Sequence, residues 1–102
     1  MVKWTALYRK PDDTEAFDKW FLEQHIDICR QWPDLDHMHA SRITGSPRGD
    51  SEFYWMFEAV YRDRDTMMAS LMSEKGMEAA MDARNSPFGK LMVSFFSESV
   101  HD

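Results

Sequence analysis

The segment from Glu52 to Arg62 constrains the fold of this 102-residue chain more than any other stretch. The residues from Phe53 to Tyr61 are almost all apolar and rich in aromatic types, which favour strands. A strand with apolar residues on both faces is buried on both faces, so we expect it at the centre of a sheet. Glu58 is the exception, and a carboxylate in such a run must be paired, face water or face a ligand.

A helix is predicted between Phe17 and Pro33. Apolar residues recur there with the 3.6-residue period of an amphipathic helix, and one polar residue shares their face. The members of this stripe are Phe17, Trp20, Phe21, Gln24 and Ile28. The pattern Asp12-x-x-Glu15 resembles a capping box that starts the helix, and Pro33 sets its end.

Strands and helices follow one another along the rest of the chain. Further strands are expected where apolar and polar residues alternate, and helical turns are expected after the central strand. These predicted elements are strands at Val2–Arg9, Leu35–Thr44 and Phe88–Val100, a hairpin loop at 45–51, and helical turns between Asp63 and Asn85. Within the helical turns, Met77, Ala80 and Met81 are expected to share one face and to fill an irregular core; the alternative for the methionines is an adaptable binding surface.

The element order β-α-β-β-α-β defines the fold class. It predicts a ferredoxin-like α+β domain over residues 1–102, with a four-stranded antiparallel sheet and the first and third strands in its centre. Two helices cover only one face of such a sheet, and the other face would leave a large apolar patch in water. We therefore expect a homodimer that packs sheet on sheet as a dimeric α/β barrel, with a cavity between the sheet and the helix ends.

Composition excludes several classes of partner. The net charge of -6 and the lack of a long basic run argue against nucleic acid. Cys29 is the only cysteine, which rules out an intramolecular disulfide and fits a reducing cytoplasm. No stretch reaches the ~18 apolar residues of a membrane-spanning helix, and the N-terminus lacks the apolar run of a signal peptide. We expect a soluble cytoplasmic protein with no membrane partner.

His25 is the candidate catalytic residue. It lies on the predicted first helix, one turn after Phe21 and one turn before Cys29. Histidine titrates near neutral pH, so it can act as a general acid or base or donate a hydrogen bond to a carbonyl oxygen. The alternative is a histidine that only makes structural bonds at a helix–sheet interface. Cys29 would be a nucleophile only if activated, and a lone helical cysteine is usually a small core residue.

Polar residues on the predicted strands are candidates for binding a substrate. They are Tyr8, His37, His39, Tyr54 and Glu58. Glu58 is placed to orient His25 if both face the same cavity. The alternative for Glu58 is an ion pair with Arg42 or Arg62.

Metal and cofactor sites are not expected. His37 and His39 share one strand face and would form a three-nitrogen metal site if His25 joined them, but no fourth ligand stands at a suitable spacing. The first strand is not followed by a glycine-rich phosphate loop, and no Cys/His cluster has zinc spacing. We therefore expect no tightly bound metal, flavin or nicotinamide.

Four short motifs occur in order along the chain. They are Val2-Lys3-Trp4-Thr5-Ala6-Leu7-Tyr8-x-Lys10-Pro11, Glu15-Ala16-Phe17 with Phe21-x-x-x-His25-Ile26, Trp32-Pro33-Asp34-Leu35, and Ser73-Glu74-x-Gly76. In them the chain resembles the EthD-like members of the dimeric α/β-barrel superfamily over nearly its whole length. Three positions depart from the family pattern: Asp27 replaces a proline, Asp34 replaces a glycine, and Met38 stands near a tyrosine.

The resemblance implies a class of function. The family is named after an accessory protein of ethyl tert-butyl ether degradation, and the wider superfamily encloses small, partly apolar molecules in its barrels. It implies a small-molecule-binding protein that assists or catalyses the degradation of an ether, lactone or aromatic oxygenate. The alternative is an isomerase, cyclase or monooxygenase that needs no cofactor and uses His25 as its acid or base. Fold-level analogy names no specific reaction.

Overall fold

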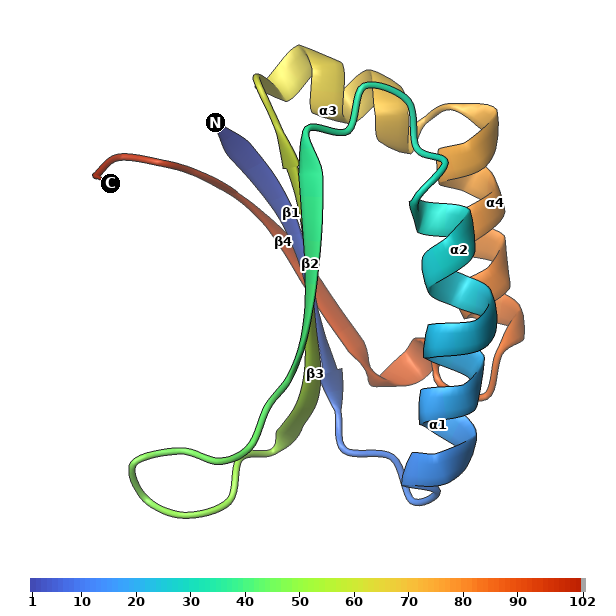
Figure 1. The fold of residues 1–102 in the computed structure, drawn as a ribbon, viewed down its shortest axis with the longest axis vertical. Helices are drawn as coiled ribbons and strands as arrows, with labels where there is room; N and C mark the ends of the chain where they lie inside the picture. Colours follow the sequence, from blue (N-terminus) through green and yellow to red (C-terminus); the bar gives the residue numbers. More distant parts are fainter. Residues whose placement is uncertain (102) are drawn as a thin grey trace.

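Four strands form one sheet, and all the helices lie on one side of it in the computed structural model, which describes residues 1–101 (Figure 1). The strands are β1 (Val2–Arg9), β2 (His37–Arg42), β3 (Phe53–Tyr61) and β4 (Met92–Glu98). The helical elements are α1 (Thr14–Trp20), the π-helical turn η1 (Phe21–His25), α2 (Ile26–Cys29), α3 (Arg64–Leu71), α4 (Glu74–Asn85) and the 3₁₀ turn η2 (Gly89–Leu91).

The sheet has the strand order β2-β3-β1-β4, and every neighbouring pair is antiparallel. The predicted ferredoxin-like fold is therefore confirmed, with the first and third strands in the centre. β1 begins and ends where the sequence predicted. β2 and β4 are shorter than expected, because the chain enters β2 through a turn at Asp34 and enters β4 through η2. Asp34 has a φ of 59°, a left-handed conformation that aspartate tolerates better than most residues.

The two faces of the sheet differ in what covers them. Residues paired directly across antiparallel strands point to the same face, and successive residues alternate. The pairs Ala6–Phe57 and Tyr8–Trp55 lie on the face that the helices cover. The other face, here called the open face, carries Lys3, Thr5, Leu7, His37, His39, Ser41, Met56, Glu58, Val60, Val93, Phe95 and Ser97.

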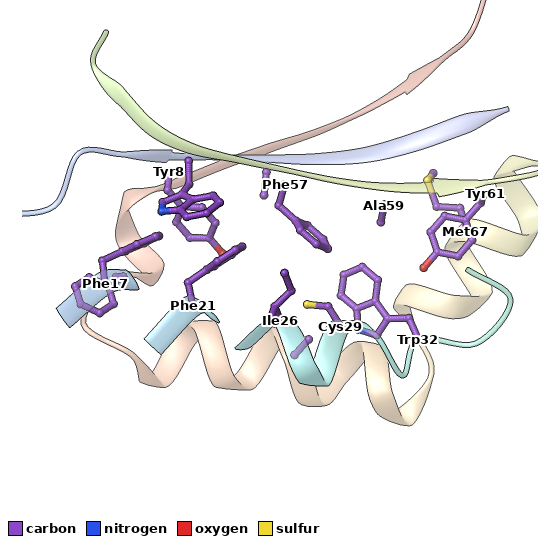
Figure 2. Close-up of a cluster of buried hydrophobic side chains, with 14 residues drawn as sticks. Tyr8, Phe17, Phe21, Ile26, Cys29, Trp32, Phe57, Ala59, Tyr61 and Met67 are labelled. Atoms are coloured by element: carbon purple, nitrogen blue, oxygen red, sulfur yellow. The ribbon is translucent and has the colours of Figure 1, made fainter. Parts of the chain in front are cut away.

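The core lies between the sheet and the helices and is mostly aromatic (Figure 2). Phe17 of α1 is fully buried and packs against Tyr8, Phe21 and Phe88 at ring-centre distances of 5.2, 5.8 and 5.1 Å. Burying one aromatic side chain of this size contributes about 1.5–3 kcal/mol. This cluster fixes the first helix on the sheet.

Side-chain caps set where each helix begins. Asp13, and not the expected Asp12, accepts a hydrogen bond from the backbone N–H of Ala16 and starts α1. Asp63 caps α3 through Thr66, and Ser73 caps α4 through Gly76. The side chain of an N-cap residue accepts a hydrogen bond from the backbone N–H two or three positions later. Asp13 meets this condition, and it lies one residue closer to the helix than Asp12.

A π-helical turn changes the phase of the first helix. The backbone N–H of Ile26 donates to the carbonyl of Phe21, five residues back, where an α-helix would bond four residues back. Beyond the turn the buried residues are Ile26 and Cys29, whereas the predicted stripe member Gln24 is exposed. The predicted buried stripe is therefore confirmed at Phe17 and Phe21. Beyond them, the buried positions lie one residue later in the chain than predicted.

The buried face of α4 also differs from the prediction. Gly76, Ala79 and Ala83 are buried, while Met77 and Met81 are 51% and 46% exposed. A Cβ on Gly76 would lie 2.3 Å from the carbonyl oxygen of Leu71, so only glycine allows the helix to start this close to α3. Small residues bring α4 near its neighbours, and the larger methionines remain outside.

Candidate functional site

A cavity of about 550 Å³ lies where α4 faces β1, β4 and the end of the first helix. Its wall is mostly apolar, with Trp4 and Trp32 as the largest side chains. The lining residues are Trp4, His25, Trp32, Leu71, Gly76, Ala79, Ala80, Ala83, Arg84, Gly89, Lys90 and Met92. A cavity of this size and composition suits a small organic molecule.

His25 is the polar group on the buried part of this wall. The side chain is 6% exposed, and its Nδ1 lies 2.9 Å from Oδ2 of Asp82 on α4. A carboxylate accepts hydrogen bonds, so this contact favours the tautomer with the proton on Nδ1. Nε2 then keeps its lone pair, and His25 lines the cavity as a potential base.

Asp82 is held in place by its own partners. The indole Nε1 of Trp20 donates to Oδ2 at 3.1 Å, and the side-chain amide of Gln24 donates to Oδ1. Trp20 also stacks on the ring of His25 with a centroid distance of 4.6 Å and an interplanar angle of 26°. Position and orientation of the imidazole are thus both fixed, which acid–base chemistry requires.

The electrostatics of this pair favour neutral imidazole. Burial lowers the pKa of His25 below its usual value, while the hydrogen bond and the charge of Asp82 oppose that shift. The net direction is downward. His25 is therefore mainly the free base at neutral pH, which is the form that can accept a proton.

The π-helical turn explains why His25 meets α4. In a regular helix, the residue four positions after Phe21 would lie directly below it, against the sheet. Here Ile26 takes that position, 7% exposed, and the extra residue turns His25 aside toward Asp82. π-helical turns are rare and often occur at functional sites.

Tyr8 and Cys29 are buried close to this pair without lining the cavity. Burial is the main cause that raises the pKa of the Tyr8 hydroxyl, and the nearby charges of Cys29 and Asp82 add to it. Burial also raises the pKa of the Cys29 thiol to about 12. Such a thiol stays protonated at neutral pH, so Cys29 acts as a small core residue.

Tyr54 forms part of a structural cluster at the other end of the first helix. The Tyr54 hydroxyl and the Trp55 indole both donate to Oδ1 of Asp18 at 3.0 Å, and Arg42 pairs with Oδ2 at 3.2 Å. These bonds tie α1 to β2 and β3. Tyr54 does not line the cavity.

The other polar candidates lie on the open face, across the sheet from His25. Glu58 pairs with Nζ of Lys3 at 3.0 Å, so the expectation that it orients His25 is wrong, as is the expected ion pair with an arginine. His37 bonds Asp36, and His39 stands opposite Glu58. Within residues 1–101, no three His, Cys, Asp or Glu side chains come together as a metal site.

Sequence reasoning missed Asp82, which holds His25 in place, and Trp32, which lines the cavity. Asp82 lies 57 positions after His25 in the chain, and nothing local connects the two. The available signal was the small-residue strip Gly76, Ala79 and Ala83, which predicts a close helix contact beside Asp82. Trp32 belongs to the motif Trp32-Pro33-Asp34-Leu35, which does not by itself predict a cavity residue.

Comparisons with known proteins identify the family of the chain. No protein-family model matches the chain, and no curated protein sequence matches it. The structure is similar to that of an ethyl tert-butyl ether (EthD) family protein from Bacillus halodurans, with 36% identity, 98% of this chain and 99% of that chain covered, and a TM-score of 0.94. The chain belongs to the EthD family.

Other structures share the fold of this EthD family member at low identity. The oxygenase SnoaB from Streptomyces nogalater, described as cofactor-independent, is 14% identical over 99% of this chain and 94% of that chain, with a TM-score of 0.69. A hydroxynitrile lyase from Passiflora edulis is 12% identical over 94% and 90%, with a TM-score of 0.71. Several further structures of the same fold, 9–15% identical to this chain, are dimeric ferredoxin-like proteins.

Within the described residues, none of the helices has the length and apolar character needed to cross a membrane.

Proposed function

We propose that this EthD family member binds a small organic molecule in the cavity and moves a proton on it with His25. The single observation that carries this proposal is that His25 lines the cavity while its Nδ1 contacts the Asp82 carboxylate behind it. Asp82 holds the Nδ1 proton, and Nε2 accepts a proton from a carbon or oxygen acid of the bound molecule. The imidazolium that forms is stabilised by the Asp82 carboxylate.

The environment of His25 fits this role. Its pKa is lowered by burial, so the base form predominates at neutral pH without another activating group. The opposing effect of Asp82 keeps the ring basic enough to take a proton. Positioned acid–base catalysis of this kind typically contributes about 10²–10⁴-fold to a rate. His25 would be the catalytic residue, and Asp82 would be a positioning residue.

Two low-identity structures of the same fold are described as a lyase and as a cofactor-independent oxygenase. They support a catalytic use of this fold and say nothing of the substrate of this chain. We retain the degradation of an ether, lactone or aromatic oxygenate as the proposed context, in the cytoplasm, without a bound cofactor.

The experiment follows solvent-exchangeable C–H protons by NMR. A panel of cyclic lactones, anthrones and cyclic ketones is incubated with the protein in D₂O, and loss of the proton signal is measured. His25→Gln should lower the exchange rate at least ~100-fold, because the amide of glutamine cannot accept the proton. The matched control is His101→Gln, which makes the same substitution at an exposed residue near the C-terminus and should leave the rate unchanged.

Two outcomes would contradict the proposal. Exchange that survives in His25→Gln would exclude this residue as the base. Binding without exchange in the parent protein would favour a second function, a carrier that holds an apolar molecule for another enzyme. The mostly apolar wall of the cavity is the observation that supports such a carrier.

A further inference from the structure

Two cations lie at the cavity of a protein that is acidic as a whole. The chain carries 18 acidic and 12 basic residues, with a net charge of -6. Arg84 at the end of α4 and Lys90 in η2 both line the cavity, and both are exposed to water. Neither belongs to the ion pairs that the described residues form, whereas Lys3, Arg42 and Lys75 are each paired with a carboxylate. The positive charge at this edge of the cavity is therefore available to a ligand.

A second polar group of the wall lacks a partner. Trp32 is 5% exposed and lines the cavity, and its indole Nε1 has no hydrogen-bond partner. Buried N–H groups are almost always bonded, so one left without an acceptor beside a cavity indicates an acceptor supplied by a ligand. An indole N–H only donates, so the ligand atom must be an acceptor such as a carbonyl or ether oxygen.

The geometry of α4 separates Arg84 from the pair His25–Asp82. On a helix with about 3.6 residues per turn, Asp82 and Arg84 fall on opposite flanks of the strip formed by Gly76, Ala79 and Ala83. Asp82 bonds His25 on one flank, and Arg84 stands on the other. A molecule lying along this strip would meet His25 at one side and Arg84 at the other, and Lys90 of η2 also lines the cavity.

We infer that the ligand of this cavity is a small cyclic organic acid whose carboxylate pairs with Arg84 and Lys90 and whose ring oxygen accepts a hydrogen bond from Trp32. The apolar ring lies between Trp4 and the small residues of α4. This inference rests on the proposed function only in using the same cavity; it concerns binding and does not require proton transfer.

The test compares matched ligands by isothermal titration calorimetry at low salt. Chromone-2-carboxylate carries both the charge and the ring carbonyl, chromone-2-carboxamide lacks the charge, and 2-naphthoate lacks the ring oxygens. The carboxylate should bind at least tenfold more tightly than the carboxamide. In the double variant Arg84→Gln/Lys90→Gln this advantage should fall to within twofold, while affinity for the carboxamide stays the same.

A second pair of cations serves as the control. Lys19→Gln/Arg48→Gln removes the same charge from exposed positions away from the cavity, and it should leave the advantage of the carboxylate intact. If both double variants reduced the affinity advantage of the carboxylate equally, that advantage would come from net charge alone, and the inference would be overturned.

Trp32 is tested separately. Chromone-2-carboxylate should bind several-fold more tightly than 2-naphthoate, and Trp32→Phe should abolish that difference, because one neutral hydrogen bond changes affinity by about fivefold. Equal binding of carboxylate and carboxamide by the parent protein would overturn the inference, and so would failure of every one of these acids to bind. Neither of these results would affect the proton-exchange test of His25→Gln. The two proposals can therefore fail independently.

Discussion

Replacing Asp82 with asparagine removes one charge and keeps the shape of the side chain. Oδ2 of Asp82 accepts from His25 at 2.9 Å and from Trp20 at 3.1 Å, and the side chain is 13% exposed. The amide oxygen of asparagine can take the place of Oδ2 and keep both bonds. Its NH₂ group then faces Gln24, whose amide can rotate to accept.

The expected loss follows from the two bonds to Oδ2. Hydrogen bonds to a charged group contribute about 1.5–3 kcal/mol each, and neutral bonds contribute about 0.5–1.5 kcal/mol. Converting two charged bonds to neutral ones should therefore lower the free energy of unfolding by about 2 kcal/mol. With an m-value of about 1–3 kcal/mol/M, the urea midpoint should fall by about 1 M.

The same substitution should change how His25 titrates. Asp82 raises the pKa of His25 against the larger effect of burial, so Asp82→Asn should lower that pKa further. Because the folded pKa lies below that of the unfolded chain, the unfolded state binds more protons at acidic pH. Stability is then full above the unfolded pKa of about 6.5 and is lost as pH falls through the folded pKa.

Two measurements check this prediction: urea unfolding at a fixed protein concentration, and NMR titration of the His25 ring protons. Glu78→Gln is the matched control, because it removes a carboxylate from an exposed position of the same helix and should cost less than ~0.5 kcal/mol. Equal urea midpoints for parent and Asp82→Asn, or an unchanged pKa of His25, would refute the assigned pairing.

Three further predictions concern the core and the assembly. Phe17→Ala should lower the free energy of unfolding by about 3–5 kcal/mol, since Phe17 is fully buried; a loss in urea unfolding below ~1 kcal/mol would contradict the packing described. The Cys29 thiol, with its pKa raised to about 12, should not react with a disulfide reagent until urea unfolds the chain; rapid reaction of the native protein would be inconsistent with its burial. Light scattering should give twice the 12.1 kDa chain mass, and Leu7→Glu on the open face should halve it; a monomeric parent would disprove the dimer.

Local patterns in the sequence were enough to predict the fold. The apolar run from Phe53 to Tyr61 placed one strand in the centre of the sheet, and the alternation from Val2 to Arg9 gave β1 its bounds. These patterns work because side chains in a strand alternate between faces regardless of what covers them. The ordered family motifs pointed to His25 as the candidate functional residue of the first helix.

The residues that share the site were not predictable in this way, because they come together through the packing of separate elements. The π-helical turn inserts a single extra residue, so the buried positions are His25 and Cys29 and not Gln24 and Ile28. The contact between His25 and Asp82 joins residues 57 positions apart. Glu58, which the sequence offered as the partner of His25, lies on the other face of the sheet, bonded to Lys3. Local patterns set the direction of each side chain within its own element, but the distance between side chains on different elements follows from how those elements pack.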